Sequence, residues 1–98
     1  MDKKKLIEIF DSNVEQYLSE WMRFLEFPSV STDPEFSDEC VSCANWLVEK
    51  LVSIGFQGEI LDTPAPGKPV VYAHRDGAKG APHILFYGHY DVQPADPP

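Results

Sequence analysis

The spacing of apolar residues changes once along this chain, at Gly55, and this change constrains the fold more than any other feature. Before Gly55, apolar residues recur three and four positions apart, which is typical of amphipathic helices. After Gly55 the period falls to about two, which is typical of strands. The sequence therefore predicts two helices followed by strands, an α/β arrangement.

The first helix is predicted from Lys3 to about Glu26, and its apolar residues form one stripe. Pro28 ends the helix, because the residue before a proline disfavours the helical region. We expect the stripe to pack in the core. It comprises Leu6, Ile9, Phe10, Val14, Tyr17, Leu18, Trp21, Met22 and Leu25.

The second helix follows a polar connection, residues 29–32, and stops at Gly55, which suits a left-handed position. Asp33 before Pro34 predicts the N-cap, with Ser37 as the alternative if the helix starts later. Cys40 and Cys43 have the spacing of a redox or zinc half-site. No second pair exists, and residues three apart share a helix face, so we interpret them as two small, semi-buried side chains.

Three strands are predicted after Gly55. The first covers residues 57–62, and a turn-rich loop at 63–67 leads to the second at 69–74. Residues 75–82 suit a hairpin connection to a third strand, which starts at His83. Residues 84–87 of that strand are apolar on both faces, as expected for a sheet covered on both sides.

Composition excludes several classes of function. The chain has 98 residues, of which 43% are hydrophobic and 24% charged, as in an ordinary globular domain. Its net charge of −8 argues against nucleic acid and anionic membrane surfaces as partners. Glu8 and Asp11 interrupt the first apolar segment, so we expect neither a signal peptide nor a membrane span. The two cysteines are consistent with a reducing compartment, and we predict a cytoplasmic protein.

The chemistry is expected at His89, which follows the third strand and Gly88. Ligands gather at the carboxyl ends of strands in open α/β sheets. Neutral imidazole is a common zinc ligand, and its second ring nitrogen usually donates to a carboxylate or carbonyl. In extended chain Asp91 lies on the same side as His89 and can hold its ring. His74 and His83, at other strand ends, are interpreted as surface residues.

The run Gly88-His89-Tyr90-Asp91-Val92-Gln93-Pro94 resembles the first metal-binding signature of the di-zinc aminoacylase and carnosine-dipeptidase family. Tyr90 and Gln93 are similar to the dipeptidase branch. The resemblance implies that His89 is a zinc ligand and that Asp91 is the catalytic-site residue that clamps it. It also implies two zinc ions, or other divalent metals, in a three-layer α/β/α domain with a mixed sheet, of which residues 1–98 form the N-terminal part. The remaining ligands and the general base would come from later sequence.

The function implied by this resemblance is hydrolysis of the amide bond in dipeptides or similar small amides by a longer parent enzyme. We expect the chain by itself to be inactive and, because its sheet is incomplete, to form homo-oligomers. Two alternatives remain open. One is a non-catalytic α/β interaction module or degenerate relative, and the other is an N-acyl-amino-acid deacylase of the same family.

Overall fold

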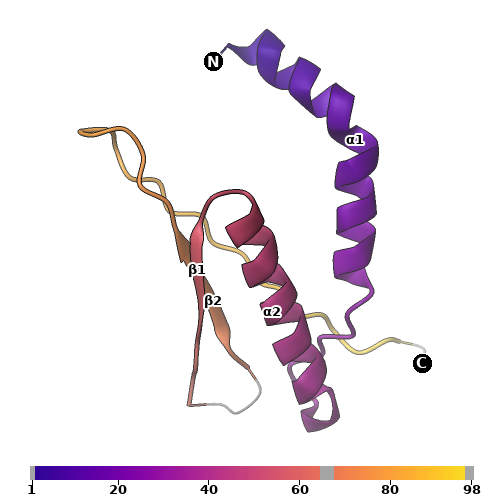
Figure 1. The fold of residues 1–98 in the computed structure, drawn as a ribbon. Helices are drawn as coiled ribbons and strands as arrows, with labels where there is room; N and C mark the ends of the chain where they lie inside the picture. Colours follow the sequence, from indigo (N-terminus) through magenta and orange to yellow (C-terminus); the bar gives the residue numbers. More distant parts are fainter. Residues whose placement is uncertain (1, 65–67, 97–98) are drawn as a thin grey trace.

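The structure is a computed structural model that describes residues 2–64 and 68–96. Two α-helices precede a hairpin of two strands, and the C-terminal segment then runs back past the second helix (Figure 1). The helices are α1, Lys3–Leu25, and α2, Ser37–Ser53, with a short 3-10 helix, η1, Pro34–Phe36, between them. The strands are β1, Gln57–Leu61, and β2, Val70–His74. The predicted α/β class, with helices before strands, is confirmed; the three-layer domain remains a prediction.

Helix α1 forms where the apolar stripe predicted it. The Asp2 side chain caps it by accepting from the backbone N–H of Lys5 at 2.8 Å. The expectation that the stripe packs in the core was wrong, because no residue of α1 is buried. Only its C-terminal part contacts α2, where the rings of Phe24 and Trp46 stack with their centroids 6.0 Å apart. The rest of α1 points away from α2 and the hairpin (Figure 1).

The α-helix α2 starts later than Asp33, but Ser37 is its first residue and Phe36 its N-cap, so neither predicted residue caps it. Asp33 accepts from the backbone N–H of Glu35 at 3.0 Å, so it caps η1, with Pro34 in the first turn. The α-helix itself begins at Ser37 without a side-chain cap. Gly55 ends it with φ +103°, the left-handed conformation that the sequence predicted.

The hairpin is antiparallel and packs against α2. Its register pairs Gln57 with His74 and Leu61 with Val70. Along both strands exposure alternates, and the more buried residues are Gly58, Ile60, Val71 and Ala73. A Cβ at Gly58 would lie 3.3 Å from the Val48 side chain, so this glycine permits the close approach of β1 to α2. Of the predicted loop at 63–67, residues 65–67 lie outside the described residues.

The predicted third strand was wrong. Within residues 2–64 and 68–96 the sheet has two strands, and it is antiparallel rather than mixed. Residues 83–90 carry no strand, and Leu85, Phe86 and Tyr87 are 87–92% exposed. A strand that is apolar on both faces is stabilised only when both faces are covered. In the described part of the chain α2 packs on the hairpin, and no layer encloses residues 84–87 from both sides.

The core lies where the connection after α1 meets the start of α2. Its members are Phe27, Ser29, Val30, Cys40, Cys43 and Ala44, each at most 9% exposed. The two cysteines are free thiols, and burial raises the pKa of both. They were expected to be semi-buried, and the structure buries both fully. Among the described residues, neither helix combines the length and apolar character needed to cross a membrane.

Candidate functional site

The end of the His89 signature is held by the short connection that precedes η1. The backbone N–H of Val92 donates to the Ser29 carbonyl at 3.0 Å, and Val30 forms a parallel bridge with Val92. The Ser29 hydroxyl, in a residue only 1% exposed, donates to the Tyr90 carbonyl at 2.8 Å. Residues 29–30 therefore fix the backbone on both sides of Asp91, about sixty positions further along the chain.

Tyr90 adds a third attachment. Its hydroxyl donates to the Pro69 carbonyl at 2.5 Å, just before β2. Burial, followed by the nearby Cys40, Cys43 and Asp91, raises the pKa of Tyr90 to about 12. The phenol therefore stays protonated and keeps its donor role through the physiological range.

His89 and Asp91 make the contact that their spacing predicted. The His89 Nδ1 atom lies 3.0 Å from Asp91 Oδ1 and 3.3 Å from the Asp91 carbonyl. Both oxygens are acceptors, so the chemistry assigns the proton to Nδ1, which donates. The other ring nitrogen, Nε2, then carries a lone pair, on a side chain that is 76% exposed.

Ser31 holds the other oxygen of the same carboxylate. Its hydroxyl donates to Asp91 Oδ2 at 2.5 Å. This bond, and then the one from His89, lowers the pKa of Asp91 although partial burial opposes the shift. Asp91 is therefore ionised at neutral pH, as required of the acceptor that holds the ring.

Sequence reasoning missed the roles of Ser29 and Ser31, which it treated as part of a polar connection. The run Ser29-Val30-Ser31 alternates polar and apolar residues but is too short to predict a strand, and Ser29 and Val30 are both buried, so the sequence carried no signal for these roles. The position of their partners, some sixty residues away, could not be read from that pattern.

The other candidate ligands do not gather at His89. Within residues 2–64 and 68–96, no group of three or more His, Cys, Asp or Glu side chains is arranged to hold a metal ion. His74 ends β2 with its ring 5.9 Å from that of Tyr72, and His83 is exposed. The donor set at the signature therefore fits one metal ligand, the imidazole of His89.

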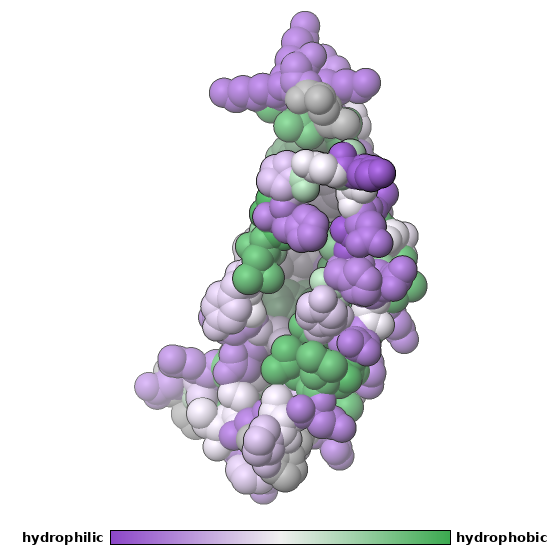
Figure 2. All heavy atoms as spheres, turned by 90° about the vertical axis from the view of Figure 1, so that its left-hand side faces the viewer, coloured by the Kyte–Doolittle hydropathy of each residue, from purple (hydrophilic) through white to green (hydrophobic). Residues whose placement is uncertain are grey.

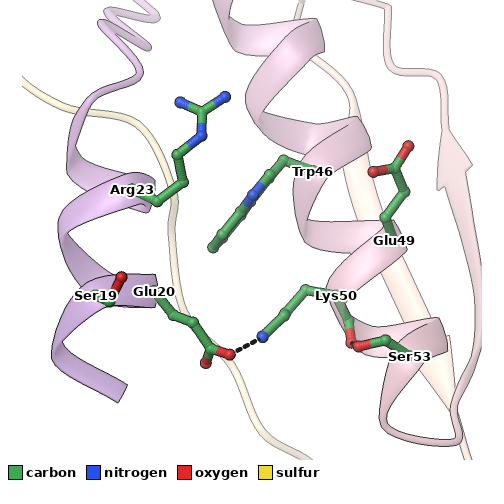
Figure 3. A pocket seen from close by; sticks show the side chains of 7 residues that line it. All are labelled: Ser19, Glu20, Arg23, Trp46, Glu49, Lys50 and Ser53. Atoms are coloured by element: carbon green, nitrogen blue, oxygen red, sulfur yellow. Dashed lines mark hydrogen bonds and ion pairs between the residues drawn. The ribbon is translucent and has the colours of Figure 1, made fainter. Parts of the chain in front are cut away.

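A separate open groove lies between α1 and α2 (Figure 3). It is lined by Ser19, Glu20, Arg23, Trp46, Glu49, Lys50 and Ser53. The Lys50 ammonium pairs with Glu20 across it, and this bond lowers the pKa of Glu20. The groove includes neither His89 nor Asp91 and holds ordinary helix-surface charges, so it is a gap between two loosely joined helices.

The chain is similar to known metallodipeptidases. It is 31% identical to the Cys-Gly metallodipeptidase of Candida albicans, over 96% of this chain and 22% of the relative. It is 27% identical to the Cys-Gly metallodipeptidase of Schizosaccharomyces pombe, over 97% of this chain and 22% of the relative. For the Beta-Ala-His dipeptidase of Rattus norvegicus the identity is 27%, over 94% of this chain and 21% of the relative.

These relatives confirm the resemblance to the dipeptidase branch that the signature indicated. The chain spans about a fifth of the length of the curated relatives it matches. No family model matches the sequence, and no solved structure matches it.

Proposed function

We propose that this chain forms part of a zinc-dependent dipeptidase in which His89 ligates the metal through Nε2. Asp91 is the carboxylate that orients the ring. One observation supports this most strongly: Asp91 Oδ1 accepts from His89 Nδ1 at 3.0 Å, which leaves Nε2 as the coordinating atom on an exposed ring. An imidazole held in this way by a carboxylate is the usual state of a zinc-bound histidine.

The chain contributes one part of such a centre. Bound zinc lowers the pKa of a water molecule to about 7 and polarises the scissile carbonyl. A catalytic zinc takes about three protein ligands, whereas the signature offers one, so the other ligands, the second zinc site and the general base come from sequence outside residues 1–98. We therefore propose that residues 1–98 are part of a catalytic domain and do not hydrolyse substrate by themselves.

The proposed substrate class is the dipeptide, because the relatives are a Cys-Gly metallodipeptidase and a Beta-Ala-His dipeptidase. This favours dipeptides over the N-acyl-amino acids of the deacylase alternative. Two buried free thiols suit a reducing compartment, and we propose the cytoplasm. The ordered contact between His89 and Asp91 favours the enzyme over a non-catalytic interaction module.

A chimeric enzyme tests this proposal. Residues 1–98 replace the matching 22% of the Candida albicans relative, and hydrolysis of Cys-Gly is measured with zinc present. We expect activity in the chimera, its loss in His89→Ala, and its retention in His74→Ala. A His89→Ala chimera as active as its parent would refute the assignment. If the chimera does not fold, the same substitutions in the relative's aligned signature give the answer.

We also propose that the isolated chain self-associates. Much of the α1 stripe is exposed, including Trp21 at 59% and Met22 at 63%, and so is the apolar segment 84–87. Apolar side chains also reach the surface between hydrophilic ones on the face that Figure 2 shows. Exposed apolar patches of this kind favour association. Light scattering at micromolar concentration should report a dimer or larger species, and a monodisperse monomer would contradict the proposal.

A further inference from the structure

We propose that Ser31 is a positioning residue for the metal ligand. Its hydroxyl fixes Asp91 Oδ2, so that Oδ1 holds Nδ1 of His89 and Nε2 remains the coordinating atom. The three side chains form a relay that runs from the connection before η1 to the signature. This inference rests on the proposed role of His89 as a ligand, but its test below requires no metal.

Two hydrogen bonds to one carboxylate restrict its rotation more than a single bond does. The terminal torsion of an aspartate is broad, so a carboxylate held at one oxygen can still turn and move its acceptor lone pairs away from the direction of the ring N–H. In Asp91, Oδ1 faces His89 Nδ1 at 3.0 Å and Oδ2 accepts from Ser31 at 2.5 Å. The second distance is that of a charge-assisted bond between a hydroxyl and a carboxylate. Ser31 therefore fixes the plane of the carboxylate, and with it the acceptor direction for the ring.

The Ser31 hydroxyl is positioned by a segment of backbone that is itself bonded to the signature. Val30, the preceding residue, is 6% exposed and bridges Val92, while the Ser29 carbonyl accepts from the Val92 N–H. Ser31 and Asp91 are thus carried on two segments that are already bonded to each other. Little further conformational entropy is lost when the hydroxyl meets the carboxylate, so the bond can persist in a partly exposed site.

Ser29 lies two residues before Ser31 but contacts a different group. Its hydroxyl donates to the backbone carbonyl of Tyr90, not to the Asp91 carboxylate. Ser29 therefore stabilises the chain path, whereas Ser31 contacts the group that faces the imidazole. The relay predicts that Ser31 alone of this pair controls which ring nitrogen of His89 bears the proton.

The test measures the tautomer of His89 by nitrogen-15 NMR of the 98-residue chain at about pH 8, above the ordinary histidine pKa of about 6.5. Ser31→Thr keeps the hydroxyl, and Ser31→Val has the shape of threonine but lacks the hydroxyl. Ser31→Ala is a second hydroxyl-free variant, and Ser53→Ala, which removes an exposed hydroxyl bonded to the Lys50 carbonyl, is the matched control.

We expect wild type, Ser31→Thr and Ser53→Ala to hold the proton on Nδ1. In Ser31→Val and Ser31→Ala the ratio of the Nδ1–H to the Nε2–H form should fall roughly threefold to tenfold, the scale of one weakened charged hydrogen bond. The same ratio in Ser31→Val and Ser31→Thr would overturn the inference, as would a wild-type ring protonated mainly on Nε2. If the tautomer ratio falls in the Ser31 variants as expected but His89 binds no zinc in the chimera, the proposed function alone is refuted.

Discussion

Two regions of this molecule carry large apolar side chains but differ in how far these are buried. Phe27 and Val30 are at most 9% exposed, and residues 29–30 are bonded to residues 90–92, whereas residues 84–87 are 75–92% exposed. The difference shows that an apolar run predicts extended chain, but its burial depends on a partner surface. Phe27 and Val30 find one at the start of α2, and Phe86 finds none among the described residues.

The same contrast in burial and bonding is found between the two sides of His89. From Tyr90 onward, each residue to Val92 has a hydrogen bond to the connection at 29–31. On the other side, residues 84–88 are exposed and form neither a helix nor a strand. His89 lies at the boundary, with its ring held by Asp91 on a side chain that is 76% exposed. The site is therefore organised from its C-terminal side.

The largest effect that we expect comes from a matched pair of phenylalanines. Phe27 is 9% exposed, contacts the Trp46 ring at 6.0 Å and lies under the Arg23 guanidinium, whereas Phe86 is 87% exposed. Phe27→Ala should lower the free energy of unfolding by about 3–5 kcal/mol, or abolish cooperative unfolding. Phe86→Ala should change it by less than about 0.5 kcal/mol. Urea denaturation followed by circular dichroism measures both, and equal effects would erase the distinction between the two regions.

A glycine pair gives a smaller effect. Gly55 ends α2 with φ +103°, and a Cβ there would lie 3.3 Å from the Arg75 guanidinium. Gly55→Ala should destabilise the chain by about 1–2 kcal/mol, the cost of a left-handed alanine. At Gly77 a Cβ would meet no atom of the described residues within 4 Å, so Gly77→Ala is the control and should stay within about 0.5 kcal/mol of wild type. Thermal unfolding of the two variants measures both changes in stability. A Gly55→Ala variant as stable as wild type would contradict the prediction.

Acid should weaken the bonded region through Asp91. The folded structure lowers the pKa of this carboxyl, so its contribution is complete above the unfolded value of about 3.9 and is lost as the pH falls through the folded-state pKa. Because Glu20 also has a lowered pKa, the informative quantity is the difference from a variant. Asp91→Asn should show a flatter loss of stability below about pH 4 than wild type, and Asp76→Asn, in an exposed loop, should not. Identical acid profiles for Asp91→Asn and wild type would mean that the Ser31 and His89 bonds do not persist in solution.

Local features of the fold could be predicted from sequence to the extent that one segment determines them. The limits of α1, the stop at Gly55 and the two strands follow from periodicity, proline and glycine, and all were found within about one residue. The third strand could not be decided in this way, because pairing needs a neighbour and not only an apolar run. The same holds for the α1 stripe, whose spacing is helical whether or not another surface covers it.

For the site, the contact between His89 and Asp91 was predictable because two residues two apart in extended chain share a side. The bonds from Ser29 and Ser31 were not, since they join positions about sixty residues apart. No spacing rule reaches across such a separation. The metal role of His89 remains a prediction supported by the held ring and by the metallodipeptidase relatives.

Equilibrium zinc binding by the chimeric enzyme measures the ligand role of His89 without depending on turnover. We expect Asp91→Asn to weaken zinc affinity about 10–100-fold, His89→Ala to weaken it more, and His74→Ala to leave it unchanged. If the His89→Ala chimera binds the same number of zinc ions as tightly as its parent, His89 is not a zinc ligand.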